Sequence, residues 1–212
     1  MTDDFDTAWR EALATHRYRL DFAAAVLRLT RIGERPVPVE RLAAAMNTSV
    51  PEVVAFVAEY GGGPMRLADG MVHHDHPAGP GPATRWTVHV GDRTIYSESG
   101  CAPDLFAAAR WIGEPIAVES VCPATGTPIR VRIGPDGADA DPATTVVSVK
   151  NPRGPEFHDL AERTYTELDE RICIGQRFFA SRAAASRWQA ANPGGRLFPV
   201  AEFPDWMRTV GF

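Results

Sequence analysis

Two residues that can do chemistry lie three positions apart in the stretch GCAPDLF at residues 100–106. Pro103 suits the first helical position, and residues 105–109 behind it favour helix. A thiol at a helix start faces unpaired backbone N–H groups, which predicts a lowered pKa for Cys101. Asp104, one turn on, can exchange a proton with that sulfur. The pair indicates soft-metal or nucleophilic chemistry; the alternative is a buried cysteine followed by an ordinary first-turn acid.

The other two cysteines are Cys122, in the turn 122–128, and Cys173, near the start of a strand expected from residue 172 to residue 180. From the residues alone, either thiol could be a buried core side chain. Only folding can bring Cys173 to Cys101, 72 positions away in the sequence. No histidine pairs with Cys101 by motif, which argues against a cysteine protease or acyltransferase. Three cysteines do not make a disulfide framework.

Composition narrows the class of protein. The chain has 212 residues, 44% apolar and 23% charged, which is typical of one large or two small globular domains with a sizeable core. A formal charge of −5 argues against a nucleic acid partner. Residues 1–6 hold three acids, unlike a signal peptide, and no run approaches the ~20 apolar residues of a membrane span. We therefore expect a cytoplasmic protein with reduced thiols and no membrane partner.

The first third of the chain is predicted to be helical. Residues 7–31 have the periodicity of one long amphipathic helix, and residues 39–57 suggest a helix-turn-helix, from which a winged-helix domain follows. The second of these helices carries Glu52 and Glu59 but no Lys or Arg. A DNA-binding regulator that senses metal through its thiols would fit the fold, but this helix lacks the basic side chains that such a protein uses to contact bases. Residues 65–71 suggest a short strand, and His73, His74 and His76 are assigned to a surface loop rather than to a metal site.

The rest of the chain alternates strands and helices. Strands are expected within 83–96 as a hairpin, at 116–120, 129–133 and 145–149, and from residue 172, with a polar loop at 134–142. Helices are expected after Cys101, within 156–170 and after Ser181. The sequence thus predicts an α+β protein: a helical, winged-helix-like domain over residues 1–80, and a catalytic domain over residues 81–212 with a small mixed β-sheet and packed helices.

The C-terminal two thirds of the chain resembles the organomercurial (alkylmercury) lyases, the MerB family. Tyr96, residues 101–105 (CAPDL) and residues 112–113 are similar to the family's Cys-x-x-Asp segment, and residues 122–128 (CPATGTP) to its Cys-x-Ala-Thr-Gly-x-Pro turn. Residues 147–149 with Pro152 fit the next strand, and Cys173, five residues before the stretch FFAS, fits the second catalytic cysteine.

The chain also departs from the family pattern around the first thiol. The family usually has an aromatic residue directly before this cysteine and an aliphatic one two positions after it, where this chain has Gly100 and Pro103. Glu98 and Ser99 look like extra residues between Tyr96 and the thiol. These positions border the site, so substrate range and pocket shape are expected to differ.

The resemblance implies that Cys101 and Cys173 bind mercury, that Asp104 transfers the proton and that Cys122 is structural. It implies a lyase that converts an organomercurial substrate into a hydrocarbon and Hg(II), as in mercury resistance. The implied partners are a low-molecular-weight thiol and a mercuric reductase that remove the product; no redox cofactor and no resident metal are needed. The alternative, motivated by Gly100 and Pro103, is a MerB-like protein that binds or transfers a soft metal without turnover.

Overall fold

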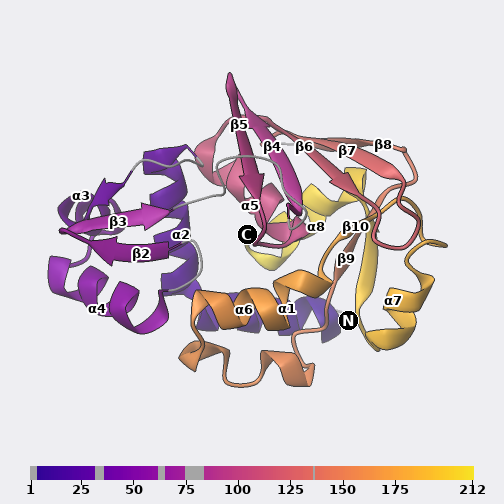
Figure 1. The fold of residues 1–212 in the computed structure, drawn as a ribbon. Helices are drawn as coiled ribbons and strands as arrows, with labels where there is room; N and C mark the ends of the chain where they lie inside the picture. The colour runs from indigo at the N-terminus through magenta and orange to yellow at the C-terminus, as the bar shows by residue number, and fades with distance from the viewer. Residues whose placement is uncertain (1–3, 32–35, 62–64, 75–83, 136) are drawn as a thin grey trace.

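The computed structural model describes residues 4–31, 36–61, 65–74, 84–135 and 137–212. Helices combine with three sheets, in agreement with the predicted α+β class. In Figure 1 the five-stranded sheet lies at the upper right with α5 (Ala102–Ile112) beneath it, and α2 to α4 with the first small sheet lie to the left. Among the described residues, no helix combines the length and apolar character that crossing a bilayer demands.

The first helical segment is two helices, α1 (Asp4–Thr15) and α2 (Arg17–Thr30), separated at His16. The prediction of one helix over residues 7–31 is therefore wrong. The two helices pack differently: α1 buries its apolar side chains in one core, whereas α2 packs Leu20 and Leu27 against that core and buries Phe22 and its neighbours in a second one. Trp9 of α1 contacts Trp206 near the end of the chain, whereas Phe22 of α2 packs on Phe56.

Two further helices and a small sheet complete the first part of the chain: α3 (Val39–Met46), α4 (Val50–Tyr60), and strands β1 (Val37–Pro38), β2 (Met65–Ala68) and β3 (Met71–His74) in the order β1-β3-β2. The expected single strand at 65–71 is a hairpin, since Asp69 and Gly70 both take positive φ and turn the chain. His73 and His74 lie in β3 rather than in a loop; His76 lies outside the described residues, as does the predicted domain boundary near residue 80.

The five-stranded sheet has the order β5-β4-β6-β7-β8 and is antiparallel throughout. Its strands are β4 (Trp86–Val90), β5 (Arg93–Ser97), β6 (Ile116–Val121), β7 (Pro128–Ile133) and β8 (Ala138–Asp141). Alternate residues such as Trp86, Val88 and Val90 are buried in the core that α5 shares. The prediction of a polar loop over 134–142 is wrong for part of this range, where β8 forms an edge strand. Ala138 and Ala140 of this strand pack against the core.

A second sheet in this part of the chain has the order β10-β9-β11 and joins β10 (Phe178–Phe179), β9 (Val146–Val149) and β11 (Arg196–Pro199). It is also antiparallel, so the predicted single mixed sheet is replaced by two antiparallel sheets. The helix expected within 156–170 is shorter: α6 covers Tyr165–Arg171, after 3₁₀ turns at Pro155–Phe157 and Leu160–Glu162. The chain ends with α7 (Ser186–Ala191), which starts later than predicted from Ser181, a 3₁₀ turn at Val200–Glu202 and α8 (Phe203–Val210).

Candidate active site

Cys101 is the N-cap residue of α5, in extended conformation between β5 and the helix. The backbone N–H of Cys101 donates to Asp104 Oδ2 at 2.7 Å. The carboxylate of Asp104, which lies in the first turn, therefore caps the start of the helix. Gly100, directly before, has φ +83°, and a Cβ there would lie 3.4 Å from Asp104 Oδ2. The positive φ therefore favours glycine at this position, where the family usually has an aromatic residue.

The second thiol approaches from a different element. Cys173 begins a 3₁₀ turn, Cys173–Gly175, after α6, so the expected strand at 172–174 is wrong. Its Sγ lies 3.8 Å from Asp104 Oδ2, and the ligand atoms of Cys101, Asp104 and Cys173 all lie within 4.8 Å of one another. Both cysteines are free thiols. Folding thus closes the gap of 72 residues that the sequence could not bridge.

Cys122 lies apart from this cluster of metal-ligand atoms. It is buried at the start of the turn after β6, where its N–H donates to Thr127 O at 2.8 Å and its carbonyl accepts from Gly126 N–H at 2.9 Å. Gly126 has φ +71°, which glycine adopts without strain. These bonds close the tight turn that the sequence predicts at residues 122–128.

The pKa of each of the three clustered groups is raised above its ordinary value. Burial raises the pKa of Cys101 well above its ordinary value, and the hydrogen bond with Cys173 and the charge of Asp104 act in the same direction. For Cys173 the hydrogen bond from Cys101 lowers the pKa, but burial and nearby carboxylates outweigh it, so the pKa is raised. Burial also raises the pKa of Asp104 against the hydrogen bonds from Cys101. The predicted lowering for Cys101 is wrong, because loss of hydration outweighs the helix start.

The cluster opens into a cavity of about 450 Å³, within the usual range for small-molecule sites. Asp104 retains accessible surface, and this surface faces the cavity. The walls of the cavity come from both halves of the chain and are mostly apolar. The residues that line it include Trp9, Leu20, Met65, Trp86, Leu105 and Trp206. An organic group could therefore lie against these walls while a bound metal contacts the thiols.

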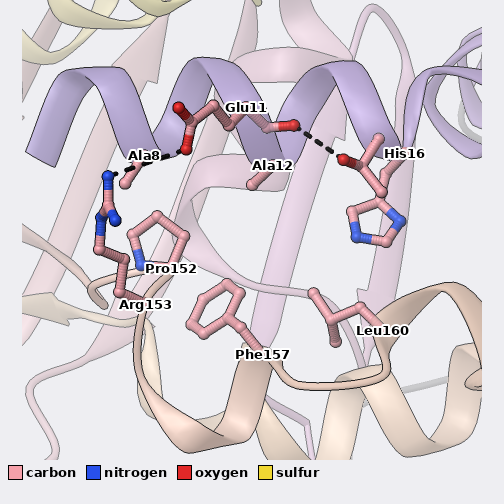
Figure 2. Close-up of a pocket in the computed structure, with 9 residues that line it drawn as sticks. Ala8, Glu11, Ala12, His16, Pro152, Arg153, Phe157 and Leu160 are labelled. Atoms are coloured by element: carbon pink, nitrogen blue, oxygen red, sulfur yellow. Dashed lines mark hydrogen bonds and ion pairs between the residues drawn. The ribbon is translucent and has the colours of Figure 1, made fainter.

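A smaller cavity of about 220 Å³ lies between α1 and the segment after Pro152 (Figure 2). At its rim Glu11 pairs with Arg153, at 3.8 Å. His16, whose pKa is lowered by burial and by Arg19, lines both cavities, as do Ala12, Phe157 and Leu160. The residues described around this smaller cavity include no cysteine, so the chemistry is assigned to the larger one.

The structure adds two charged residues that sequence reasoning missed. Arg85 and Asp169 form a bidentate ion pair, with Nη1–Oδ1 at 3.0 Å and Nη2–Oδ2 at 3.2 Å, and both lie against Gly100. They are 84 positions apart, and neither belongs to a motif. No signal in a single sequence could have paired them.

Comparisons with known proteins identify the family of the chain. The alkylmercury lyase (MerB) family model matches residues 82–209. An alkylmercury lyase from Pseudomonas putida is 31% identical over 196 residues, 90% of this chain and 84% of that protein, and one from Streptomyces lividans is 29% identical over 175 residues, 79% and 72% of the two chains. A crystal structure of the mercury-bound form of MerB2 shares the fold with a TM-score of 0.59 at 18% identity, covering 98% of this chain and 97% of that one. The chain therefore belongs to the alkylmercury lyase family.

Proposed function

We propose that this protein is an organomercurial lyase, which cleaves carbon–mercury bonds by protonation and yields a hydrocarbon and Hg(II). The observation that carries the proposal is the cluster of Cys101, Asp104 and Cys173, whose ligand atoms lie within 4.8 Å of one another at an apolar cavity. Mercury is soft and prefers thiolate sulfur over oxygen or nitrogen. Two thiols with a carboxyl between them supply both metal ligands and the acid.

The first step is thiol exchange. The organomercurial, R–Hg–X, loses X to solution as X–H when one cysteine of the pair forms a sulfur–mercury bond, and the thiol proton leaves with X. The apolar walls hold R, and their contact area favours organic groups over hydrated ions.

The second step brings the other thiol to the metal. Its S–H bond breaks as a second S–Hg bond forms, and Asp104 accepts the proton. Two thiolates raise the electron density on mercury and weaken its bond to carbon. Asp104 then returns the proton to carbon: the electron pair of the C–Hg bond becomes the C–H bond, and R–H leaves. Proton transfer requires the two groups to lie within hydrogen-bond reach, and the Cys173 thiol donates to Asp104 Oδ2 at 3.8 Å, so Asp104 can take the proton of that thiol.

The product is Hg(II) bound to both cysteines, with Asp104 ionised beside it. We propose that a low-molecular-weight thiol releases this metal by further exchange and that a mercuric reductase receives it, with no redox cofactor in the lyase itself. Such partners imply a cytoplasmic enzyme.

We also infer that the first part of the chain is winged-helix-like. This is supported by α3, a short turn, α4 and the antiparallel sheet β1-β3-β2. α4 carries no Lys or Arg, which does not suit a helix that reads DNA bases. This part of the chain instead contributes Val26 of α2 and Met65 of β2 to the wall of the cavity, beside residues of the catalytic segment. We propose that it covers the substrate's organic group rather than binding DNA.

The test is gas chromatography of headspace benzene from phenylmercury, or methane from methylmercury, with excess small thiol. Wild type, Cys101→Ser and Cys173→Ser are run beside Cys122→Ala, which changes the thiol outside the cluster. We expect hydrocarbon from wild type and Cys122→Ala but not from the two serine variants. Mercury binding without hydrocarbon from wild type would contradict the lyase and would identify a metal-binding relative.

A further inference from the structure

We propose that Asp169, paired with Arg85, is a positioning residue that sets the distance between the two mercury-binding thiols. The inference rests on the proposed lyase function and deepens it, because neither residue belongs to the Cys-x-x-Asp segment or to the turn that carries Cys173. Neither has an atom in the metal-ligand cluster.

Both backbone groups of Gly100 are bonded to this pair. The Gly100 N–H donates to Asp169 Oδ1 at 2.7 Å, and the Gly100 carbonyl accepts from Arg85 Nη1 at 2.7 Å. The indole N–H of Trp86 donates to the same carbonyl at 3.3 Å. The residue directly before Cys101 is therefore fixed on both sides, and with it the direction in which the cysteine leaves the turn.

Asp169 ties this turn to the element that carries the second thiol. It lies in α6, four residues before Cys173, so its bond to Gly100 joins the approach to one thiol to the approach to the other. A second link runs parallel to it, from Ala102 N–H to Gln176 O at 3.0 Å. One link precedes and one follows each cysteine, so the backbone positions from which the two thiols project are restrained relative to each other.

The pair is suited to this task because it is shielded. The side chain of Arg85 is 9% exposed and that of Asp169 22% exposed. A guanidinium that bonds a carboxylate at two points has a defined orientation, whereas a lysine in its place would act as a point charge. The backbone of Arg85 is also restrained, since its N–H donates to Ser97 O at 2.8 Å.

The experiment compares mercury coordination and turnover in wild type, Asp169→Ala, Asp169→Asn, Arg85→Lys and Glu156→Ala. The last is a control for the bonds to Gly100: Lys150 and Glu156 form an ion pair of similar burial, 12% and 25% exposed. Lys150 Nζ donates to Arg171 O at 2.9 Å, so this pair supports the approach to Cys173, whereas the bonds of Gly100 go to Arg85 and Asp169. Coordination is followed by ultraviolet sulfur-to-mercury charge transfer and by resistance of bound Hg(II) to extraction by a monothiol. Circular dichroism confirms folding.

We expect Asp169→Ala and Arg85→Lys to lose the bis-thiolate signal and at least tenfold in turnover, while Glu156→Ala keeps both. Asp169→Asn retains Oδ1, the atom that Gly100 N–H and Arg85 Nη1 share, and is expected to stay closer to wild type than Asp169→Ala. A bis-thiolate signal equal to wild type in Asp169→Ala, or an equal loss in Glu156→Ala, would overturn the proposal. If Asp169→Ala does not fold, Arg85→Lys decides in the same way.

The two hypotheses fail separately. Wild type that binds mercury through both thiols without releasing hydrocarbon, while Asp169→Ala lacks the bis-thiolate signal, would refute the lyase and support the positioning role. Hydrocarbon from wild type, with Asp169→Ala indistinguishable from Glu156→Ala, would support the lyase and refute the positioning role.

Discussion

Replacing Asp104 with asparagine should abolish turnover while leaving mercury binding intact. Asparagine keeps an oxygen that can accept from Cys101 N–H, the 2.7 Å bond that caps α5, so little stability should be lost. Alanine would also remove the cap, at about 1 kcal/mol. What the amide cannot do is carry a proton to carbon. General acid catalysis contributes about 10²–10⁴-fold, so the barrier should rise by about 3–5 kcal/mol.

The assay is single-turnover release of benzene from phenylmercury, with Hg(II) binding measured separately by titration. Glu52→Gln provides the matched control, because Glu52 caps α4 in the same way, accepting from Ser49 N–H at 2.9 Å, and neither Glu52 nor Ser49 lines the cavity. We expect the control to release benzene at the wild-type rate. Turnover of Asp104→Asn within threefold of wild type would refute Asp104 as the proton donor.

Further expectations concern the turn, the cavity and pH. Gly100→Ala should cost about 1–2 kcal/mol of unfolding free energy, since φ is +83° there, and should reduce benzene release; an unchanged melting temperature would contradict this. Ala23→Leu, on the cavity wall, should reduce kcat/KM for phenylmercury about tenfold relative to methylmercury; equal effects would refute it. Hydrogen bonds from Ser49 and Thr48 lower the pKa of Glu52 from 4.5 to about 2, so its stabilisation, complete above about pH 4.5, is lost as pH falls towards 2. Urea unfolding at pH 3 and pH 7 should show a smaller difference for Glu52→Gln than for wild type.

Local features of the fold were predictable because local physics decides them. Pro103 and the residues after it specify the start of α5, and alternation of apolar residues specifies β4 and β7. The position of Asp104 in the first turn follows from the same segment, and the structure adds that its carboxylate caps the helix. In each case the residues that form the structure are neighbours in the sequence, so a window of ten residues contains the information.

Features that depend on distant partners were not predictable in this way. The helix breaks at His16, and α1 packs on α8, about 190 residues later in the chain. The sequence of residues 7–31 by itself does not indicate this break. Cys173 lies in a 3₁₀ turn although its neighbours Ile172 and Ile174 favour strand, and Ile174 remains exposed. The direction in which the pKa of Cys101 is shifted also depends on burial. A helix start indicates a lowered value, but the amount of water removed by the rest of the fold decides the outcome.

The raised pKa values are consistent with the reaction that we propose. Cleavage of a carbon–mercury bond by protonation consumes one proton at carbon, inside a mostly apolar cavity where an unpaired charge is costly. Two preformed thiolates would bind the metal readily but would leave that proton to be imported. A second cysteine that arrives as a thiol brings the proton with it, and Asp104 has only to move it from sulfur to carbon. Burial of Cys101 therefore favours the thiol over the thiolate and keeps a proton on sulfur, beside the bond that will break.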